Sequence, residues 1–144
     1  MNSQLERDAN LAWNSFVDLI AIEDYEKLTD IQRTAHLAFW YDAEVCNGGH
    51  LQYFANSSGK RAVETVDALV DMKMEEQCAV LEDAIAFALK NPLPELETAE
   101  EFVAEALENR FGAFDSRYYN CAKSTNQFLE EYLENHFSDF IELI

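Results

Sequence analysis

The chain has 144 residues, of which 28 are Asp or Glu and 10 are Lys or Arg, and its formal net charge is −18. Its 49% hydrophobic content excludes a disordered acidic chain, because disorder requires low hydrophobicity as well as high charge. So negative a protein is not expected to bind nucleic acid or anionic membranes directly, because phosphates repel its surface.

The composition favours one all-α domain over residues 1–144, with about seven helices. Only four Gly and two Pro occur, which is few for the many turns of a β-sandwich. We see no signal peptide and no apolar stretch near the roughly 20 residues of a membrane span. Cys46, Cys78 and Cys121 are odd in number and widely spaced, which is typical of reduced thiols. We therefore expect a cytoplasmic protein.

Apolar residues recur at helical spacing in the first part of the chain. Residues 3–21 are expected to form an amphipathic helix. Thr29 or Asp30 can cap a second helix, which is expected to break at Asn47-Gly48-Gly49. Asn and Gly tolerate the left-handed conformation that ends helices. A short helical segment over residues 50–55 is expected to follow.

Helices are also expected over residues 60–72 and 75–90. Pro92 and Pro94 follow the second of these helices and prevent it from extending further. Thr98 followed by Glu101 is a capping-box pattern and predicts a helix that ends near Arg110.

The C-terminal part predicts two more helical segments. After a loop at Phe111-Gly112, a helical piece is expected over residues 116–123. Ser124 or Thr125 can cap a last helix that runs to near the C-terminus.

The most specific local string spans residues 44–59. It reads as a helix end, a tight turn, a short helix and a second stop. The residues that define it are Glu44, Asn47, Gly48, Gly49, Gln52, Tyr53, Phe54, Asn56 and Gly59. From the residues alone we interpret this string as a structural element in which the glycines let two helices approach.

The string resembles a bacterial family of DNA-mimic proteins, formerly a domain of unknown function. The resemblance extends over about residues 30–141 and includes Phe114-Asp115 and the later Arg117-Tyr118-Tyr119. It implies a homodimer whose acidic surface binds a basic DNA-binding protein such as a transcription factor. The chain departs from the family at His50, where an aromatic or another bulky residue is usual.

Acidic residues gather in the middle of the chain, where 13 acids and two bases lie between Glu64 and Glu108. We predict that two acidic stripes contact the partner, and they consist of Glu64, Asp67 and Asp71, and of Glu97, Glu101, Glu105 and Glu108. The alternative is an interaction or scaffold domain whose acidity serves only solubility.

An enzyme is the third functional hypothesis. We do not favour it, and we predict no catalytic residue, no metal site and no cofactor. His36, Asp42, Glu44, Cys46 and His50 are close in sequence and include types that bind metals. However, the two histidines lie on either side of the expected helix break, and no histidine pair has the usual metal-binding spacing. Cys46 and His50 could form a thiol–imidazole pair, but no third residue is evident to orient it.

Overall fold

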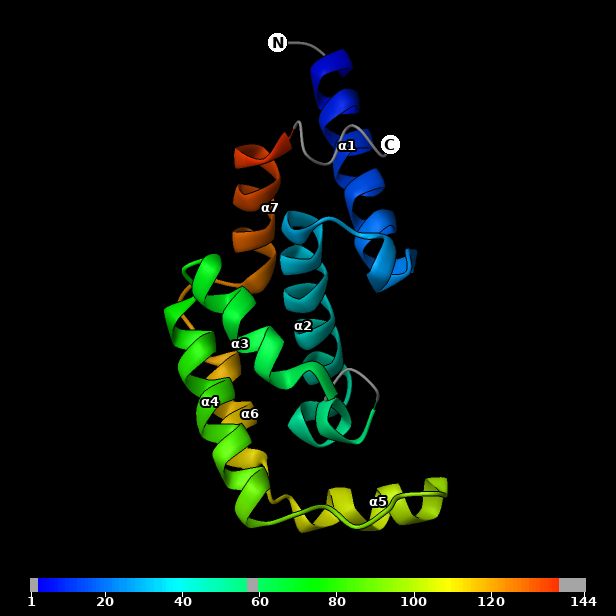
Figure 1. Ribbon diagram of the computed structural model, residues 1–144, viewed down its shortest axis with the longest axis vertical. Coiled ribbons are helices and arrows are strands. Elements are labelled where there is room, and N and C mark those ends of the chain that lie inside the picture. Colours follow the sequence, from blue (N-terminus) through cyan, green and yellow to red (C-terminus); the bar gives the residue numbers. More distant parts are fainter. Residues whose placement is uncertain (1–2, 57–59, 138–144) are drawn as a thin grey trace.

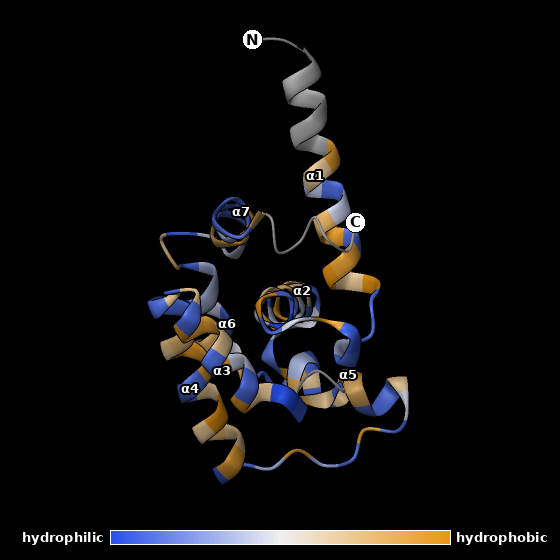
Figure 2. Cartoon of the chain, turned by 45° about the horizontal axis from the view of Figure 1, so that its top comes forward, coloured by the Kyte–Doolittle hydropathy of each residue, from blue (hydrophilic) through white to orange (hydrophobic). Residues whose placement is uncertain are grey.

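One long helix, α2 (Asp30–Ala55), occupies the centre of the molecule. The computed structural model describes the backbone of residues 3–56 and 60–137, and side chains from residue 11 onward. Helices α1 (Ser3–Ile22), α3 (Ala62–Asp71), α6 (Gly112–Tyr119) and α7 (Thr125–Asn135) pack against α2, as the view along its axis illustrates (Figure 2). Helix α4 (Glu75–Lys90) covers α3 and α6.

The described residues thus form seven α-helices and no strand, and a 3-10 turn, η1 (Tyr25–Lys27), joins α1 to α2. This confirms the all-α prediction. The expected helices over 3–21, 60–72 and 75–90 match α1, α3 and α4 to within two residues. In this described part of the chain, no helix has the length and apolar character of a membrane span.

Capping side chains begin α2 and α7 as the sequence indicates. Thr29 accepts a hydrogen bond from the Gln32 amide, and the Gln32 side chain accepts one from the Thr29 amide. Ser124 and Gln127 form the same reciprocal pair at α7. Each pair satisfies two amides that a helix start leaves without partners. These two starts are therefore fixed by local sequence.

Helix α5 (Ala99–Glu108) begins with half of the expected capping box. The Thr98 hydroxyl accepts from the Glu101 amide, as predicted. The Glu101 carboxylate, however, accepts from the amide of Glu97 rather than from that of Thr98. The helix ends at Asn109, whose φ of 51° is left-handed, slightly before the predicted end at Arg110.

The prediction for the segment after α5 was wrong. A loop was expected at Phe111-Gly112 and a helix over residues 116–123, whereas α6 begins at Gly112 and ends at Tyr119. Phe111 is buried and its ring contacts Phe54 and Phe87, so core packing places this turn where the sequence suggested a loop.

A sharp kink divides α2 at the expected position. Gly48 has φ −144° and Gly49 has φ 72° with ψ −174°, a region that only glycine adopts readily. Tyr41 precedes the kink and Tyr53 follows it, yet their ring centroids are 4.9 Å apart. Twelve residues of straight helix would separate them by about 18 Å. The kink therefore folds the end of α2 back onto its own middle.

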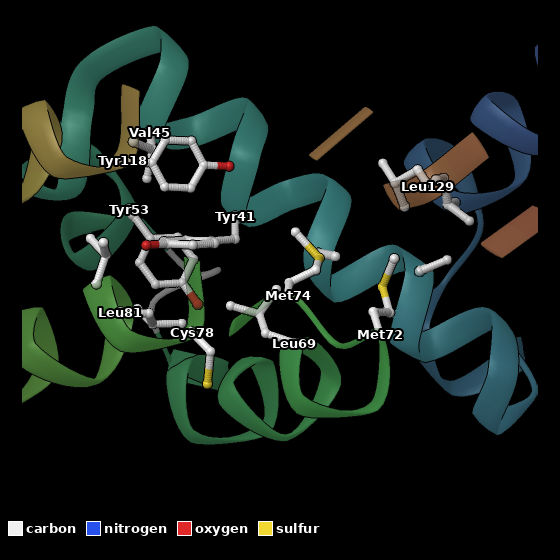
Figure 3. Packing of buried hydrophobic residues seen from close by; sticks show 14 of the residues in the cluster. Tyr41, Val45, Tyr53, Leu69, Met72, Met74, Cys78, Leu81, Tyr118 and Leu129 are labelled. Atoms are coloured by element: carbon white, nitrogen blue, oxygen red, sulfur yellow. The ribbon is translucent and has the colours of Figure 1, made fainter. Parts of the chain in front are cut away.

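The folded-back segment builds an aromatic core around Tyr41. Tyr41, Tyr53 and Tyr118 lie together in Figure 3, with Leu81 nearby, and all four are buried. The Tyr53 hydroxyl donates to Thr65, and the Tyr118 hydroxyl donates to Asp42. Burial raises the pKa of Tyr53 to about 12 and raises the pKa values of Tyr41 and Tyr118 as well. The core is thus mostly apolar, but its stability also depends on buried tyrosine hydroxyls that stay neutral and hydrogen-bonded.

The kink yields a first prediction about stability. Replacing Gly49 with Ala should lower the free energy of unfolding by about 2 kcal/mol or more, because its backbone conformation is disfavoured for any other residue. A Cβ at Gly49 would also lie 2.5 Å from a carboxylate oxygen of Asp115. Urea unfolding followed by circular dichroism measures the loss.

Gly48→Ala is the matched control. Its φ suits other residues, and the new Cβ would clash with Oε1 of Gln52 and lie 2.8 Å from Cβ of Gln52, so the cost comes from a shift of that side chain and not from the backbone conformation. We expect a smaller loss than for Gly49→Ala. Equal losses in the two variants would contradict the role assigned to the Gly49 conformation.

The buried phenols yield a prediction about alkaline pH. Above pH 10 the unfolded chain loses the Tyr53 proton, whereas the folded chain keeps it until about pH 12, so stability falls as pH rises through this window. Tyr53 alone should contribute a loss of about 1 kcal/mol between pH 8 and pH 11. Urea unfolding at both pH values should give a smaller drop for Tyr53→Phe than for the wild type. An identical drop would exclude this contribution.

Candidate partner-binding surface

The first predicted acidic stripe lies on the outer face of α3. Asp67 and Asp71 are exposed, and they alternate with the exposed apolar side chains of Val63 and Val70. Glu64 is also exposed, but it is already engaged within the molecule. Its carboxylate accepts a hydrogen bond of 2.7 Å from the Tyr25 hydroxyl and pairs with Arg61 at 3.5 Å. Asp67 and Asp71 are therefore the two carboxylates of this stripe that are open to a partner.

The second stripe belongs to α5 and to the residue before Thr98. Glu97, Glu101 and Glu108 are exposed. Glu105 was predicted on the same exposed stripe, but the structure buries it to 9% exposure and pairs it with Arg110. The left-handed turn at Asn109 comes directly before Arg110 in the chain. Glu105 thus serves to hold the end of α5 and contributes little to the external field.

The two stripes belong to different parts of the fold. Helix α3 packs against α2 and α4. Helix α5 lies at the end of the molecule opposite the N-terminus, after the extended segment 91–98 (Figure 1). None of the more extensive helix pairs in the described part of the chain includes α5. The stripes are therefore two separate acidic patches on the chain and do not merge into one continuous helix face.

Few bases neutralise these patches. Most ion pairs formed by the described Lys and Arg residues lie elsewhere, as in Lys27 with Glu23, Arg117 with Asp83 at 2.8 Å, and Lys123 with Glu131. Within the described residues, no ion pair reaches Asp67, Asp71, Glu97, Glu101 or Glu108. Their charges are consequently available to attract a basic surface.

The residues of the 44–59 string surround the kink. The Asn47 side chain donates to Gln52 at 3.0 Å, and the Asn56 side chain donates to Glu44 at 3.0 Å. Tyr53 and Phe54 pack into the aromatic core, the latter against Phe111. Gly48 and Gly49 form the kink itself, whereas Gly59 lies outside the described residues.

Asp115, to which the sequence assigned no role, ties this kink to α6. One of its oxygens accepts two hydrogen bonds from His50, at 2.8 Å from the backbone amide and 2.7 Å from ring Nδ1. Because a carboxylate only accepts here, Nδ1 carries a proton. The Tyr41 hydroxyl bonds to the other ring nitrogen at 2.7 Å. No local sequence pattern links positions 50 and 115. In the sequence, Asp115 was noticed only as part of the Phe114-Asp115 pair in the family resemblance.

The residues considered for catalysis do not assemble. Both ring nitrogens of His50 bond to Asp115 and Tyr41, whereas the Cys46 thiol lies 3.7 Å from Asp42. Burial, with Asp42 nearby, raises the pKa of Cys46 to about 11, which keeps the thiol protonated and weakly nucleophilic. His36 bonds to the carbonyl of Ile20. Among the described residues, no three His, Cys, Asp or Glu side chains are placed to hold a metal ion.

Comparison with known proteins assigns the family. A family model described as DMP19-like protein matches residues 26–136 of the chain. No curated protein and no solved structure gave a match. The matched region includes the kink, the aromatic core and both acidic patches, and nearly coincides with the region 30–141 inferred from the sequence. The chain therefore belongs to the DMP19-like family, the DNA-mimic family that its kink motif resembles.

Proposed function

We propose that this protein is an acidic DNA mimic that occupies the DNA-binding surface of a transcription factor or another basic DNA-binding protein. The observation that carries the proposal is the set of exposed carboxylates on α3 and near α5 that have no ion-pair partner within the described residues. Membership of the DMP19-like family supports the same reading.

The spacing of charge favours several patches acting together. Duplex DNA carries one charge per about 1.7 Å of its axis. A helix with acids at every fourth position offers only about one per 6 Å. Glu105 is withdrawn into its ion pair with Arg110, which thins the α5 patch further. A single helix therefore falls short, and we propose that the α3 and α5 patches contact the partner jointly.

A homodimer would bring more acidic patches to one partner. We infer this assembly, and a cytoplasmic location, from the resemblance to the bacterial DNA-mimic family and from the sequence analysis. Sedimentation of the full chain at physiological salt should give twice the mass of 16.5 kDa. A monomer at micromolar concentration would exclude the homodimer.

The second candidate is a scaffold domain whose partner contacts apolar side chains. Val103 and Leu107 on α5 favour it, because they are 57% and 81% exposed. In this reading the partner should stay bound at high salt, and Leu107→Ser should weaken its capture.

Charge neutralisation distinguishes the two candidates. A variant with Asp67→Asn, Asp71→Asn, Glu97→Gln, Glu101→Gln and Glu108→Gln removes five charges and keeps similar side-chain shapes. DNA mimicry predicts that its affinity for the DNA-binding protein captured from a host lysate falls by about tenfold or more, because each exposed ion pair contributes up to about 1 kcal/mol. Titration calorimetry with the identified partner measures the change.

The control neutralises exposed acids on α1, α4 and α7, namely Asp18, Glu75, Glu76, Glu130 and Glu134. This variant has the same net charge, and we expect affinity near that of the wild type. In the wild type, affinity should also fall steeply as salt increases, and duplex DNA should compete for the partner. A response that is flat with salt, or equal losses in both variants, would contradict mimicry by these patches.

A further inference from the structure

An open cavity of about 630 Å³ lies where the end of α1, η1, the first half of α2 and the start of α3 meet. Its size is within the range of small-molecule sites. His36, Trp40 and Glu44 line it together, and their spacing of four residues places them on one face of α2. Tyr25, Arg61 and Glu64 line it from the neighbouring elements.

Glu44 has an unfilled hydrogen-bonding capacity at this cavity. The residue is only 7% exposed. Its Oε1 accepts from Asn56 at 3.0 Å, but within the described part of the chain its Oε2 has no hydrogen-bond partner. A buried carboxylate oxygen without a donor is unfavourable, so a donor that reached it would be stabilised. Oε2 itself has almost no accessible surface, so the Glu44 carboxylate has to turn toward the cavity before a ligand can donate to it. The Asn56 contact alone needs only an acceptor, which an amide would supply.

The other carboxylates at the cavity already have basic partners. Lys27 lies 3.9 Å from Glu23 and 3.6 Å from Asp24. Arg61 lies 3.5 Å from Glu64. Glu44 forms no ion pair among the described residues. No cationic side chain is thus paired with Glu44 among the described residues, although Lys60 lines the same cavity.

The cavity wall already holds one guanidinium in the way that a ligand would be held. The Arg61 guanidinium lies 3.7 Å from the centre of the Tyr25 ring and pairs with Glu26 and Glu64. Trp40 and Glu44 offer a similar combination of aromatic ring and carboxylate, and indole is the best of the aromatic rings for stacking on a cation. Burial lowers the pKa of His36, so its imidazole is neutral near pH 7 and does not repel a cation.

We propose that this cavity binds an organic cation, a guanidinium or alkylammonium group, whose N–H groups donate to the Glu44 carboxylate, turned toward the cavity, while its charge lies against Trp40. The cation is either a free small molecule or a basic side chain of the protein partner. The affinity of the cavity for cations does not depend on the proposed function, and only its occupation by a partner side chain does.

An NMR titration of the full chain tests this site without any partner protein. The probe is N-acetyl-arginine amide, and N-acetyl-citrulline amide is its neutral counterpart of nearly the same shape. We expect saturable shifts of the Trp40 indole and the Glu44 amide with the arginine probe alone. Equal binding of the citrulline probe, no saturable shift, or shifts of the same signals by inorganic phosphate would overturn the proposal.

Glu44→Gln is the decisive variant, because the amide oxygen still accepts from Asn56 while the charge is lost. We expect arginine-probe binding to weaken by about tenfold or more, as for the loss of a hydrogen bond to a charged group. Glu134→Gln removes one exposed charge from α7 and should bind like the wild type. Equal affinities of all three proteins would exclude Glu44 as the ligand.

Two further variants keep the test decisive if Glu44→Gln folds poorly. Trp40→Leu should also weaken binding, because it removes the aromatic surface. Lys60→Gln should bind at least as tightly as the wild type, since Lys60 lines the cavity and competes as a cation. Unchanged binding in Trp40→Leu, or weaker binding in Lys60→Gln, would count against the site.

The source of the cation follows from the capture experiment with Glu44→Gln. Weaker capture of the DNA-binding protein would assign the cavity to a partner side chain. Unchanged capture, with loss of arginine-probe binding, would assign it to a free small cation. Because the probe titration contains no partner, failure of the cavity proposal and failure of DNA mimicry give different results.

Discussion

The interaction on which the rest of the structure depends is the double hydrogen bond from His50 to Asp115. It joins residues 65 positions apart, and it places a carboxylate of α6 at the kink of α2. The backbone amide of His50, which the kink removes from the helical hydrogen-bond pattern, donates to this carboxylate. With the kink fixed in this way, Tyr53 returns to Tyr41 and Phe54 reaches Phe111, so the core closes between elements distant in sequence. Both ring nitrogens of His50 are hydrogen-bonded, to Asp115 and to Tyr41, so the imidazole is held in place at the kink.

The protein separates its charges from its core with few exceptions. Buried polar groups such as Gln77 are hydrogen-bonded, in that case to the carbonyl of Lys123. Most acids lie on outer helix faces, where water screens their mutual repulsion. Glu44 is different, because it is buried and only half satisfied. It belongs to the kink motif, yet only its first oxygen is hydrogen-bonded there, to Asn56, and its second has no partner among the described residues.

Local sequence predicted the parts of this fold that depend on local physics. Thr29, Thr98 and Ser124 were recognisable as helix caps because a hydroxyl near a helix start has one main use. Gly48 and Gly49 marked the kink because glycine permits its backbone. The start of α6 was missed because burial of Phe111 against Phe54 decides it. Glu105 was misplaced on an exposed stripe because helical spacing does not reveal that Arg110 pairs with it from beyond a left-handed turn. Asp115 could not be assigned, since its partner is 65 residues away.

The sparse packing of α5 makes its outer face largely independent of the stability of the core. Among the described residues, its main links to the remainder of the chain are the extended segment 91–98, the residues around Phe111 and the ion pair of Glu105 with Arg110. A helix attached in this way can unfold locally without disturbing the residues around Tyr41. Substitutions on its outer face therefore cost the domain little stability. The charge of this outer face can therefore be changed while the kinked scaffold around Tyr41 stays intact.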